Sequence, residues 1–276
     1  MILFLFSCNG PAEKGPEIDL EPVTDTQTET EAPSTSQPDS LTELYLLELR
    51  AGGANYIWRF HTDTFDIEEA GELHCPLSNE DDYLTALTSD PKGILWGLSE
   101  EYEIVQINPS SLACTLFGAR ASNEYFLAES FAFIEQEGQP LFYMAGYHTG
   151  SAGASSTALA KLADGAIQII AEIGNLEGQD TVIDVATSPD QALFGYRGWG
   201  NLSEQIRFSP DTGVPAQTWT VSLETGEAFA FLRDNQTSWI FTATAEGGSQ
   251  IHTFAGNELI WARDLQITVV GAAGIN

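Results

Sequence analysis

The sequence predicts an all-β fold built from five repeats of a four-stranded unit. Three observations lead to this prediction. Short apolar runs alternate with turn signals, the runs recur at a nearly constant spacing, and the two ends of the repeat region match neighbouring strands of one unit. All three concern residues 42–276 of the 276-residue chain.

One kind of apolar run recurs five times. Its copies are ELYLLEL (43–49), ILWGLS (94–99), LFYMAG (141–146), ALFGYRG (192–198) and SWIFTAT (238–244). Their first residues are 51, 47, 51 and 46 positions apart. Regular spacing of this length is typical of repeat architectures in which each repeat is one sheet.

Each unit holds three more strand-like segments. From the second unit on, a strand precedes the apolar run: YLTALTSD, ESFAFIEQ, VIDVATSP and AFAFLRDN. Two strands follow it, as SQIHTFAGN and LIWARDL do in the last unit, joined by a turn at Gly256-Asn257. Gly, Asn, Asp and Pro supply the backbone conformations of such turns. Four strands per unit are typical of a β-propeller blade.

The chain ends indicate how the repeats close. The first strand (43–49) is of the second kind within its unit, and the last segment, ITVVGAAG (267–274), is of the first kind. Pairing the two would complete one blade and remove an exposed edge. We therefore predict a five-bladed β-propeller of four-stranded antiparallel blades, closed by pairing of the N- and C-terminal strands. A β-sandwich, two small β domains, or a sixth blade formed by the loops remain as alternatives.

In architecture these repeats resemble propellers of the WD40/NHL-like kind, over about residues 43–276. The Gly-His and Trp-Asp signatures of WD40 repeats are absent. The resemblance therefore implies a fold and no role for any residue.

The N-terminus resembles the end of a bacterial lipoprotein signal. Residues 1–6 are apolar, and Leu5, Phe6, Ser7 and Cys8 occupy the positions of a lipobox. The resemblance implies a signal remnant over residues 1–8, lipidation of Cys8, and, because Asn9 follows, anchoring at the outer membrane. The segment lacks a basic start, which fits either a start further upstream or an imperfect signal. The alternative is an apolar tail with a buried Cys8.

Residues 9–41 predict a disordered acidic linker. They include eight acidic residues, one basic residue and no aromatic residue. Such a segment buries too little apolar area to offset its chain entropy, and its like charges extend it. The expected organisation is an anchor (1–8), a linker (9–41) and a propeller domain (42–276).

Charge and composition limit the partners. The formal net charge is -30, which excludes nucleic acid and electrostatic docking on anionic lipid. Membrane contact is then expected through the lipid anchor only, and no apolar run is long enough to span a bilayer. Cys75 and Cys114 could pair in an oxidising compartment. The repeat alignment does not place them opposite each other, which favours two free or buried thiols.

Four acidic residues recur just before the first strand of a unit: Asp82, Glu129, Asp180 and Glu227. If the first strands line a central channel, these carboxylates form a ring at its mouth. Such a ring could bind Ca²⁺ or an amine, or supply paired carboxylates for acid/base chemistry. The alternative is that they are solvated loop acids.

Two further residues are candidate ligand contacts. His148 is expected in a long Gly/Ser loop beside Tyr147, and Trp199 lies in RGWGN, where an aromatic side chain could stack on a sugar or a protein. A solvated loop histidine is the alternative for His148. The sequence has no paired-histidine zinc motif and no GxSxG nucleophile motif.

These observations favour an envelope lipoprotein that presents a non-enzymatic propeller for binding a ligand, an envelope protein or a glycan. The alternative is a divalent-cation-dependent hydrolase or lactonase that uses the carboxylate ring.

Overall fold

The computed structural model describes residues 41–275 except for short gaps at 137, 150–154, 176–181, 200–201, 224–227, 235 and 245–246. These residues belong to one compact unit, Gln37–Asn276, while Met1–Ser36 form a separate unit outside the described residues. The predicted anchor at Cys8 and nearly all of the predicted linker therefore lie outside the described part of the chain.

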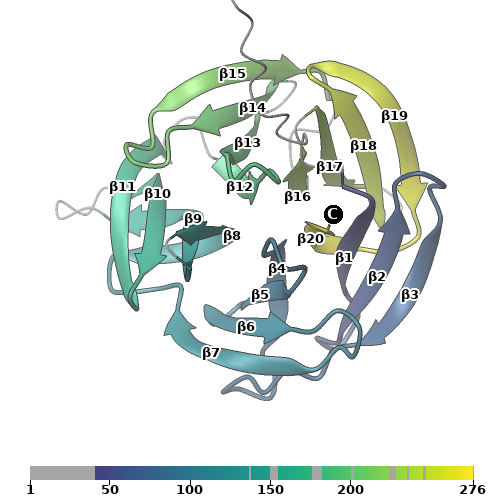
Figure 1. The fold of residues 1–276 in the computed structure, drawn as a ribbon, viewed down its shortest axis with the longest axis horizontal. Helices are drawn as coiled ribbons and strands as arrows, with labels where there is room; N and C mark the ends of the chain where they lie inside the picture. Colours follow the sequence, from purple (N-terminus) through teal and green to yellow (C-terminus); the bar gives the residue numbers. More distant parts are fainter. Residues whose placement is uncertain are drawn as a thin grey trace, which may run out of the picture. The chain divides into compact units, whose positions relative to one another are not determined.

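In the described residues, twenty β-strands form five four-stranded antiparallel sheets. Figure 1 shows these sheets arranged around a central axis. The inner strands are β4 (Leu84–Ser89), β8 (Phe126–Gln136), β12 (Val182–Thr187), β16 (Ala228–Arg233) and β20 (Val269–Ile275). The second strands are β1 (Glu43–Leu49), β5 (Leu95–Ser99), β9 (Gln139–Thr149), β13 (Leu193–Trp199) and β17 (Thr237–Ala243). The third strands are β2 (Asn55–His61), β6 (Glu103–Ile107), β10 (Ser155–Ala163), β14 (Leu202–Phe208) and β18 (Ser249–Ala255). The outer strands are β3 (Ile67–Glu72), β7 (Cys114–Arg120), β11 (Ala166–Asn175), β15 (Pro215–Val221) and β19 (Glu258–Leu265).

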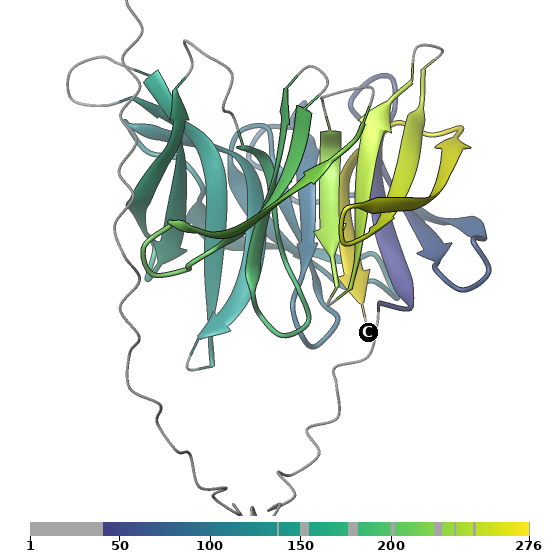
Figure 2. The same ribbon diagram turned by 90° about the horizontal axis from the view of Figure 1, so that it is seen from above.

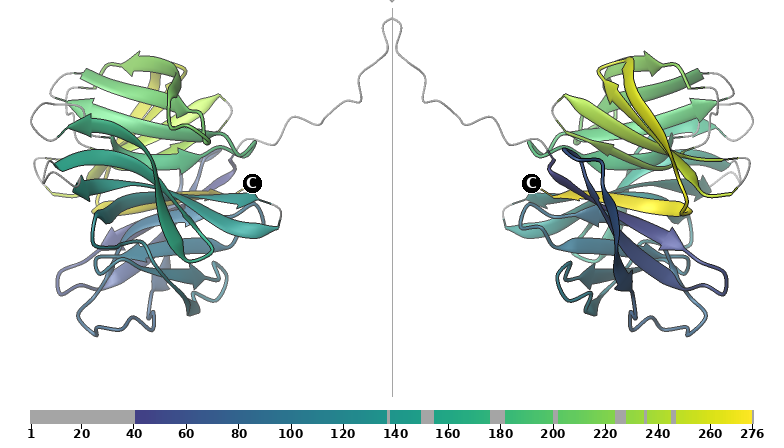
Figure 3. Two further views of the ribbon diagram at one scale, coloured as in Figure 1. Left: turned by 90° about the vertical axis from the view of Figure 1, so that its left-hand side faces the viewer. Right: turned by 90° about the vertical axis from the view of Figure 1, so that its right-hand side faces the viewer.

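This arrangement confirms the predicted five-bladed β-propeller. Figure 3 shows from the side how each blade twists between its inner and outer strands, as β-sheets do. The apolar segments that the sequence predicts as strands are strands in the structure, and each sheet contains the predicted four. Among the described residues, no helix is long and apolar enough to cross a membrane.

The closure of the ring is also confirmed. Blade 1 has the strand order β20-β1-β2-β3, so its inner strand comes from the C-terminus and its other three from the N-terminal part of the domain. Blades 2, 3, 4 and 5 consist of β4–β7, β8–β11, β12–β15 and β16–β19. Glu43 lies opposite Ile275 and Leu46 lies opposite Ala272 in this pairing. The hydrogen bonds between the two ends make opening of the ring unfavourable, and they cover the edge of β1 that would otherwise be exposed.

Burial follows strand position within each blade. The second strand β1 is almost entirely buried, whereas the outer strand β7 is mostly exposed. This explains why the second strands read as continuous apolar runs while the outer strands are more polar. Tight turns between inner and second strands are held by side chains, as when Asp90 Oδ1 accepts hydrogen bonds from the backbone N–H groups of Lys92 and Ile94.

Aromatic and aliphatic side chains fill the wedges between blades. Trp96 of blade 2 is buried, with its ring centroid 5.7 Å from that of Phe133 and 5.2 Å from that of Phe142, both in blade 3. Trp261 of blade 5 stacks on Phe65 of blade 1 with centroids 4.5 Å apart. Trp96 and Trp261 therefore pack between blades.

Neighbouring inner strands are joined by hydrogen bonds between side chains and backbone. The backbone N–H of Phe133 in β8 donates to Thr88 Oγ1 in β4, and that of Val185 in β12 donates to Ser130 Oγ in β8. Ser89 Oγ of β4 donates to the carbonyl oxygen of Gly274 in β20. These bonds tie one blade to the next around the channel, where no backbone ladder does so.

One expectation about the cysteines is wrong. Cys75 and Cys114 form a disulfide with a Cα–Cα distance of 4.9 Å, where two free thiols were favoured. Cys75 follows β3 in the connection from blade 1 to blade 2, and Cys114 begins β7 at the outer edge of blade 2. The repeat alignment missed this pair because it compares equivalent strands of different units. The disulfide instead joins the connection that follows β3 to the outer strand β7, and the two are close only in the folded domain.

Candidate binding site at the channel mouth

The central channel has two different ends. All inner strands run in the same direction, so their first residues lie on one face of the propeller, the loop face, and their last residues on the opposite face, the turn face (Figure 2). A hollow of about 310 Å³, the mouth hollow, opens at the loop face. Its lining includes Tyr83, Thr85, Glu129, Ser130, Asp184 and Phe229.

A β-bulge in every inner strand shapes this hollow. In each blade one residue of the inner strand is skipped in the pairing with the second strand. The skipped residues are Thr85, Glu129, Ile183, Phe229 and Val270. A bulge re-aims the extra side chain away from the regular sheet faces, and four of the five (Thr85, Glu129, Phe229 and Val270) line the mouth hollow.

Glu129 is the acidic member of this bulge set. It is accessible to solvent through the mouth, and its partial burial raises the pKa of its carboxyl. The described residues supply neither a hydrogen bond nor an ion pair to it. Its negative charge reaches the rim of the hollow, since it is the main cause that raises the pKa of Tyr147 and a contributor, after burial, to the raised pKa of Tyr102.

Asp184 lies one residue beyond the bulge of β12 and points into the same hollow. Its Oδ1 accepts the backbone N–H of Val185, and its Oδ2 accepts that of Phe231 on β16. Burial raises the pKa of Asp184 to about 8, although these bonds and a contact with Ser130 oppose the shift. Burial therefore favours the neutral form of this carboxyl, and Glu129 is the more exposed acid of the hollow.

Large side chains are exposed at the loop-face ends of blades 3 and 5. They are Tyr125 (52% exposed), Leu127 (40%), Tyr147 (42%) and Phe229 (44%), of which Phe229 lines the mouth hollow. Leu127 and Tyr147 are register partners in blade 3, and Phe229 comes from the bulge of blade 5. A grouping of exposed aromatic residues beside a hollow is typical of a binding site rather than of an ordinary surface.

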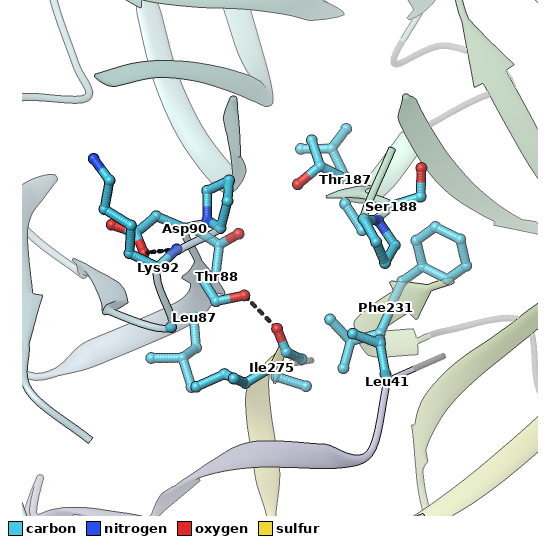
Figure 4. A pocket seen from close by; sticks show the side chains of 18 residues that line it. Leu41, Leu87, Thr88, Asp90, Lys92, Thr187, Ser188, Phe231 and Ile275 are labelled. Atoms are coloured by element: carbon cyan, nitrogen blue, oxygen red, sulfur yellow. Dashed lines mark hydrogen bonds between the residues drawn. The ribbon is translucent and has the colours of Figure 1, made fainter. Parts of the chain in front are cut away.

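The opposite end of the channel is smaller and more polar. A hollow of about 160 Å³ at the turn face is lined by Thr88, Asp90, Lys92, Thr187 and Ser188, with Leu41, Phe231 and Ile275 on one side (Figure 4). Leu41 is buried there and packs against Gly274. The chain therefore enters the propeller at the turn face, away from the mouth hollow.

The structure separates two of the four predicted ring carboxylates. Glu129 lines the mouth hollow, whereas Asp82 lines a hollow of about 520 Å³ between blades 1 and 2, beside His74 and Cys75. Asp82 Oδ1 accepts the backbone N–H of Tyr83, and its Oδ2 is buried with no hydrogen-bond partner among the described residues. Asp180 and Glu227 lie outside the described residues. No group of three or more His, Cys, Asp or Glu side chains within the described part of the chain is arranged to bind a metal ion.

Of the two other candidate contacts, His148 does not line the mouth hollow. His148 lies on β9 opposite Phe126 and Ser156, and its Nδ1 is 3.5 Å from Glu172 Oε1 of the outer strand. Trp199 is the last residue of β13, and its side chain lies outside the described part of the structure.

Sequence reasoning missed Asp184 and Phe229. Both signals were present: an acid inside the apolar run VIDVAT, at the position that Ser130 holds in FLAESFAF, and a Phe at the start of AFAFLR. The sequence alignment considered only the acids that precede each first strand. A bulge shifts the register by one residue, and the alternation of apolar and polar residues does not reveal where a bulge lies.

Comparisons with known proteins identify a fold and no family. No protein-family model matches this chain, and the curated proteins contain no match. Among solved structures, a chain of a nidogen/laminin complex matches with a TM-score of 0.50 and 11% identity, over 83% of this chain and 97% of that chain. A protein of unknown function from Bacteroides caccae matches with a TM-score of 0.52 and 9% identity, over 86% of this chain and 100% of that chain. At such low identity the likeness concerns the propeller fold alone.

Proposed function

We propose that this protein is a bacterial envelope lipoprotein whose propeller is a non-enzymatic binding module, and that its ligand docks at the mouth hollow. The observation that carries the proposal is the mouth itself, where the exposed Phe229 and the carboxylate of Glu129 line one hollow, and Glu129 has no partner among the described residues. The exposed Tyr147 lies near enough for the charge of Glu129 to raise its pKa. Apolar walls with a few convergent polar groups are the usual features of a ligand site.

The disulfide supports an envelope location. Cys75–Cys114 joins two partly buried side chains at the edge of blade 2. Disulfides persist in the periplasm and at cell surfaces, whereas cytosolic thiols are kept reduced. This is independent of the lipobox-like residues Leu5–Cys8, and the two observations favour the same compartment.

The mouth hollow lies on the face of the domain opposite to Leu41. Leu41 joins the propeller at the turn face, where Thr42 N–H donates to the carbonyl of Ile275. Leu41 therefore does not obstruct the mouth hollow, at which we expect an envelope protein or a glycan to bind.

Two experiments test these proposals. The Cys8→Ser variant should move the protein from the membrane to the soluble fraction in cell fractionation, and unchanged membrane retention would contradict the anchor.

Photo-crosslinking in intact cells, with benzoylphenylalanine replacing Tyr147, should give adducts. Replacement of Lys92 on the turn face is the control, and adducts at Lys92 without adducts at Tyr147 would contradict binding at the mouth.

A hydrolase or lactonase is the second candidate. The observation that favours it is that Glu129 and Asp184 line one hollow and both have raised pKa values, as a general acid requires. The metal-dependent form predicts that Ca²⁺ raises the melting temperature and that a chelator lowers it. The binding-module proposal predicts no shift with Ca²⁺ beyond that seen with Mg²⁺ at equal ionic strength.

A further inference from the structure

The mouth hollow combines apolar walls with one unneutralised charge. The walls include Leu49, Phe229 and Val270, and none of the described residues that line the hollow is basic. Glu129 is held there by the bulge of β8 and has no partner among the described residues. Glu129 is exposed to solvent and has no counter-charge among the described residues, so a ligand that brings a positive charge could form a charge-assisted hydrogen bond with it.

The oxygens of the hollow suit one small positive charge better than a divalent cation. Ca²⁺ takes six to eight oxygen ligands. Three of the available side-chain oxygens are already engaged, since Ser130 Oγ and Asp184 Oδ1 both accept the N–H of Val185 and Asp184 Oδ2 accepts that of Phe231. Glu129 remains as the principal acceptor, which matches a monovalent cation with hydrogen-bond donors.

The aromatic residues favour an organic cation. Phe229 is 44% exposed and lines the hollow, and the Tyr147 hydroxyl lies within the field of Glu129. Aromatic rings attract ammonium and guanidinium groups and also cover the aliphatic stem that carries them. The net charge of -30 would draw such ligands toward the domain.

We propose that the mouth hollow binds an alkylammonium or guanidinium group, with the cationic head at Glu129 and the aliphatic stem against Phe229 and Val270. This inference rests on the proposed function and names the chemistry of its ligand. The group can belong to a small amine or to a Lys or Arg side chain of a protein, which share this chemistry.

Ligand-observed NMR titration of the full-length protein tests the proposal with defined probes. The probes are blocked lysine (N-acetyl-lysine methylamide), its neutral counterpart N-acetyl-norleucine methylamide, and n-butylammonium. We expect the blocked lysine to bind at least about tenfold more tightly than the norleucine probe, and high salt to weaken it. Equal binding of n-butylammonium would identify a small amine as a sufficient ligand, and preference for blocked lysine would identify a side chain; both outcomes support the cationic group.

Glu129→Gln is the decisive variant, because it keeps the shape of an accessible side chain and removes its charge. It should weaken the blocked lysine at least about tenfold and leave the norleucine probe unchanged. Glu124→Gln is the matched control, since Glu124 is exposed in the loop before β8 and does not line the hollow. A thermal melt confirms that both variants are folded.

Three results would overturn the inference: equal affinity for lysine and norleucine probes, no effect of Glu129→Gln, or no binding of any probe. None of them decides the proposed function, because crosslinking at Tyr147 reports occupancy of the mouth whatever the charge of the ligand. Adducts at Tyr147 together with charge-independent probe binding would leave the binding module in place and remove its cationic ligand.

Discussion

The carboxylate of Asp184 accepts a hydrogen bond from the backbone N–H of Phe231, which belongs to the inner strand of the next blade. Its other oxygen accepts the N–H of Val185 on its own strand. One partly buried side chain therefore joins β12 to β16 in the wall of the mouth hollow. Stability and charge are coupled at this point, because the same carboxyl holds the blades together and titrates.

Asp184→Asn should change how stability depends on pH. Burial raises the folded pKa to about 8 from an ordinary value of 3.8, so the folded state binds this proton more tightly than the unfolded state. The resulting stabilisation is complete below the ordinary value and is lost as pH rises through about 8. Relative to the variant, the wild type should lose about 1 kcal/mol per pH unit between pH 5 and 8.

Urea unfolding at pH 5, 6, 7 and 8 measures this difference. Asp66→Asn is the control, since Asp66 is exposed in the turn between β2 and β3. A difference between wild type and Asp184→Asn that does not vary with pH would show that Asp184 titrates alike in both states.

Removal of the disulfide should destabilise the domain. Cys75 and Cys114 are 39 residues apart, and the chain-entropy model gives an upper value of about 4 kcal/mol for a loop of this length. The double variant Cys75→Ser, Cys114→Ser should melt at a lower temperature than the oxidised wild type. Reductant should lower the melting temperature of the wild type and leave the double variant unaffected; equal melting of oxidised and reduced wild type would contradict a stabilising bond.

Gly271→Ala should weaken closure of the ring. A Cβ at position 271 would lie 2.7 Å from the backbone nitrogen of Leu87 and 2.9 Å from the carbonyl carbon of Ala86, so β20 and β4 would have to separate. Forcing a side chain into such a contact costs about 1–3 kcal/mol. Hydrogen exchange should show faster exchange in β20 and β1 of the variant. Protection equal to that of the wild type would mean that the two strands tolerate the extra atom.

His252 should make the domain sensitive to acid. Its Nε2 lies 3.0 Å from Thr242 Oγ1, and burial lowers its pKa. Because the unfolded state takes up this proton first, stability should fall as pH decreases below the ordinary histidine value of about 6.5. Thermal melts between pH 7 and 5 should show a smaller loss of stability for His252→Gln than for the wild type. His74→Gln, an exposed histidine, is the control, and a wild-type loss matched by both variants would exclude His252 as the cause.

The fold was predictable because its signals are local and repeated. Each second strand is buried on both faces and reads as an apolar run, as ELYLLEL and SWIFTAT do, and polar turn residues such as Asp90 mark where it begins. The matching ends at 43–49 and 267–274 indicated the closure for the same reason.

The candidate site was predictable only in part. The sequence identified Glu129 because it lies beside an apolar run. It also grouped Glu129 with Asp82, because both precede a first strand, whereas the structure places the two residues in different hollows. The bulge in each inner strand moves one residue out of register, and bulge geometry depends on how the second strand pairs with it.

By itself, the sequence determined the number of blades, the four strands in each and the pairing of the ends, because hydrophobic periodicity and turn chemistry are properties of neighbouring residues. The tertiary structure alone decided that Glu129, Asp184 and Phe229 share one hollow and that Cys75 reaches Cys114. These contacts join residues from different blades or from a connection and a strand, and their distances are set by how twisted sheets pack around an axis.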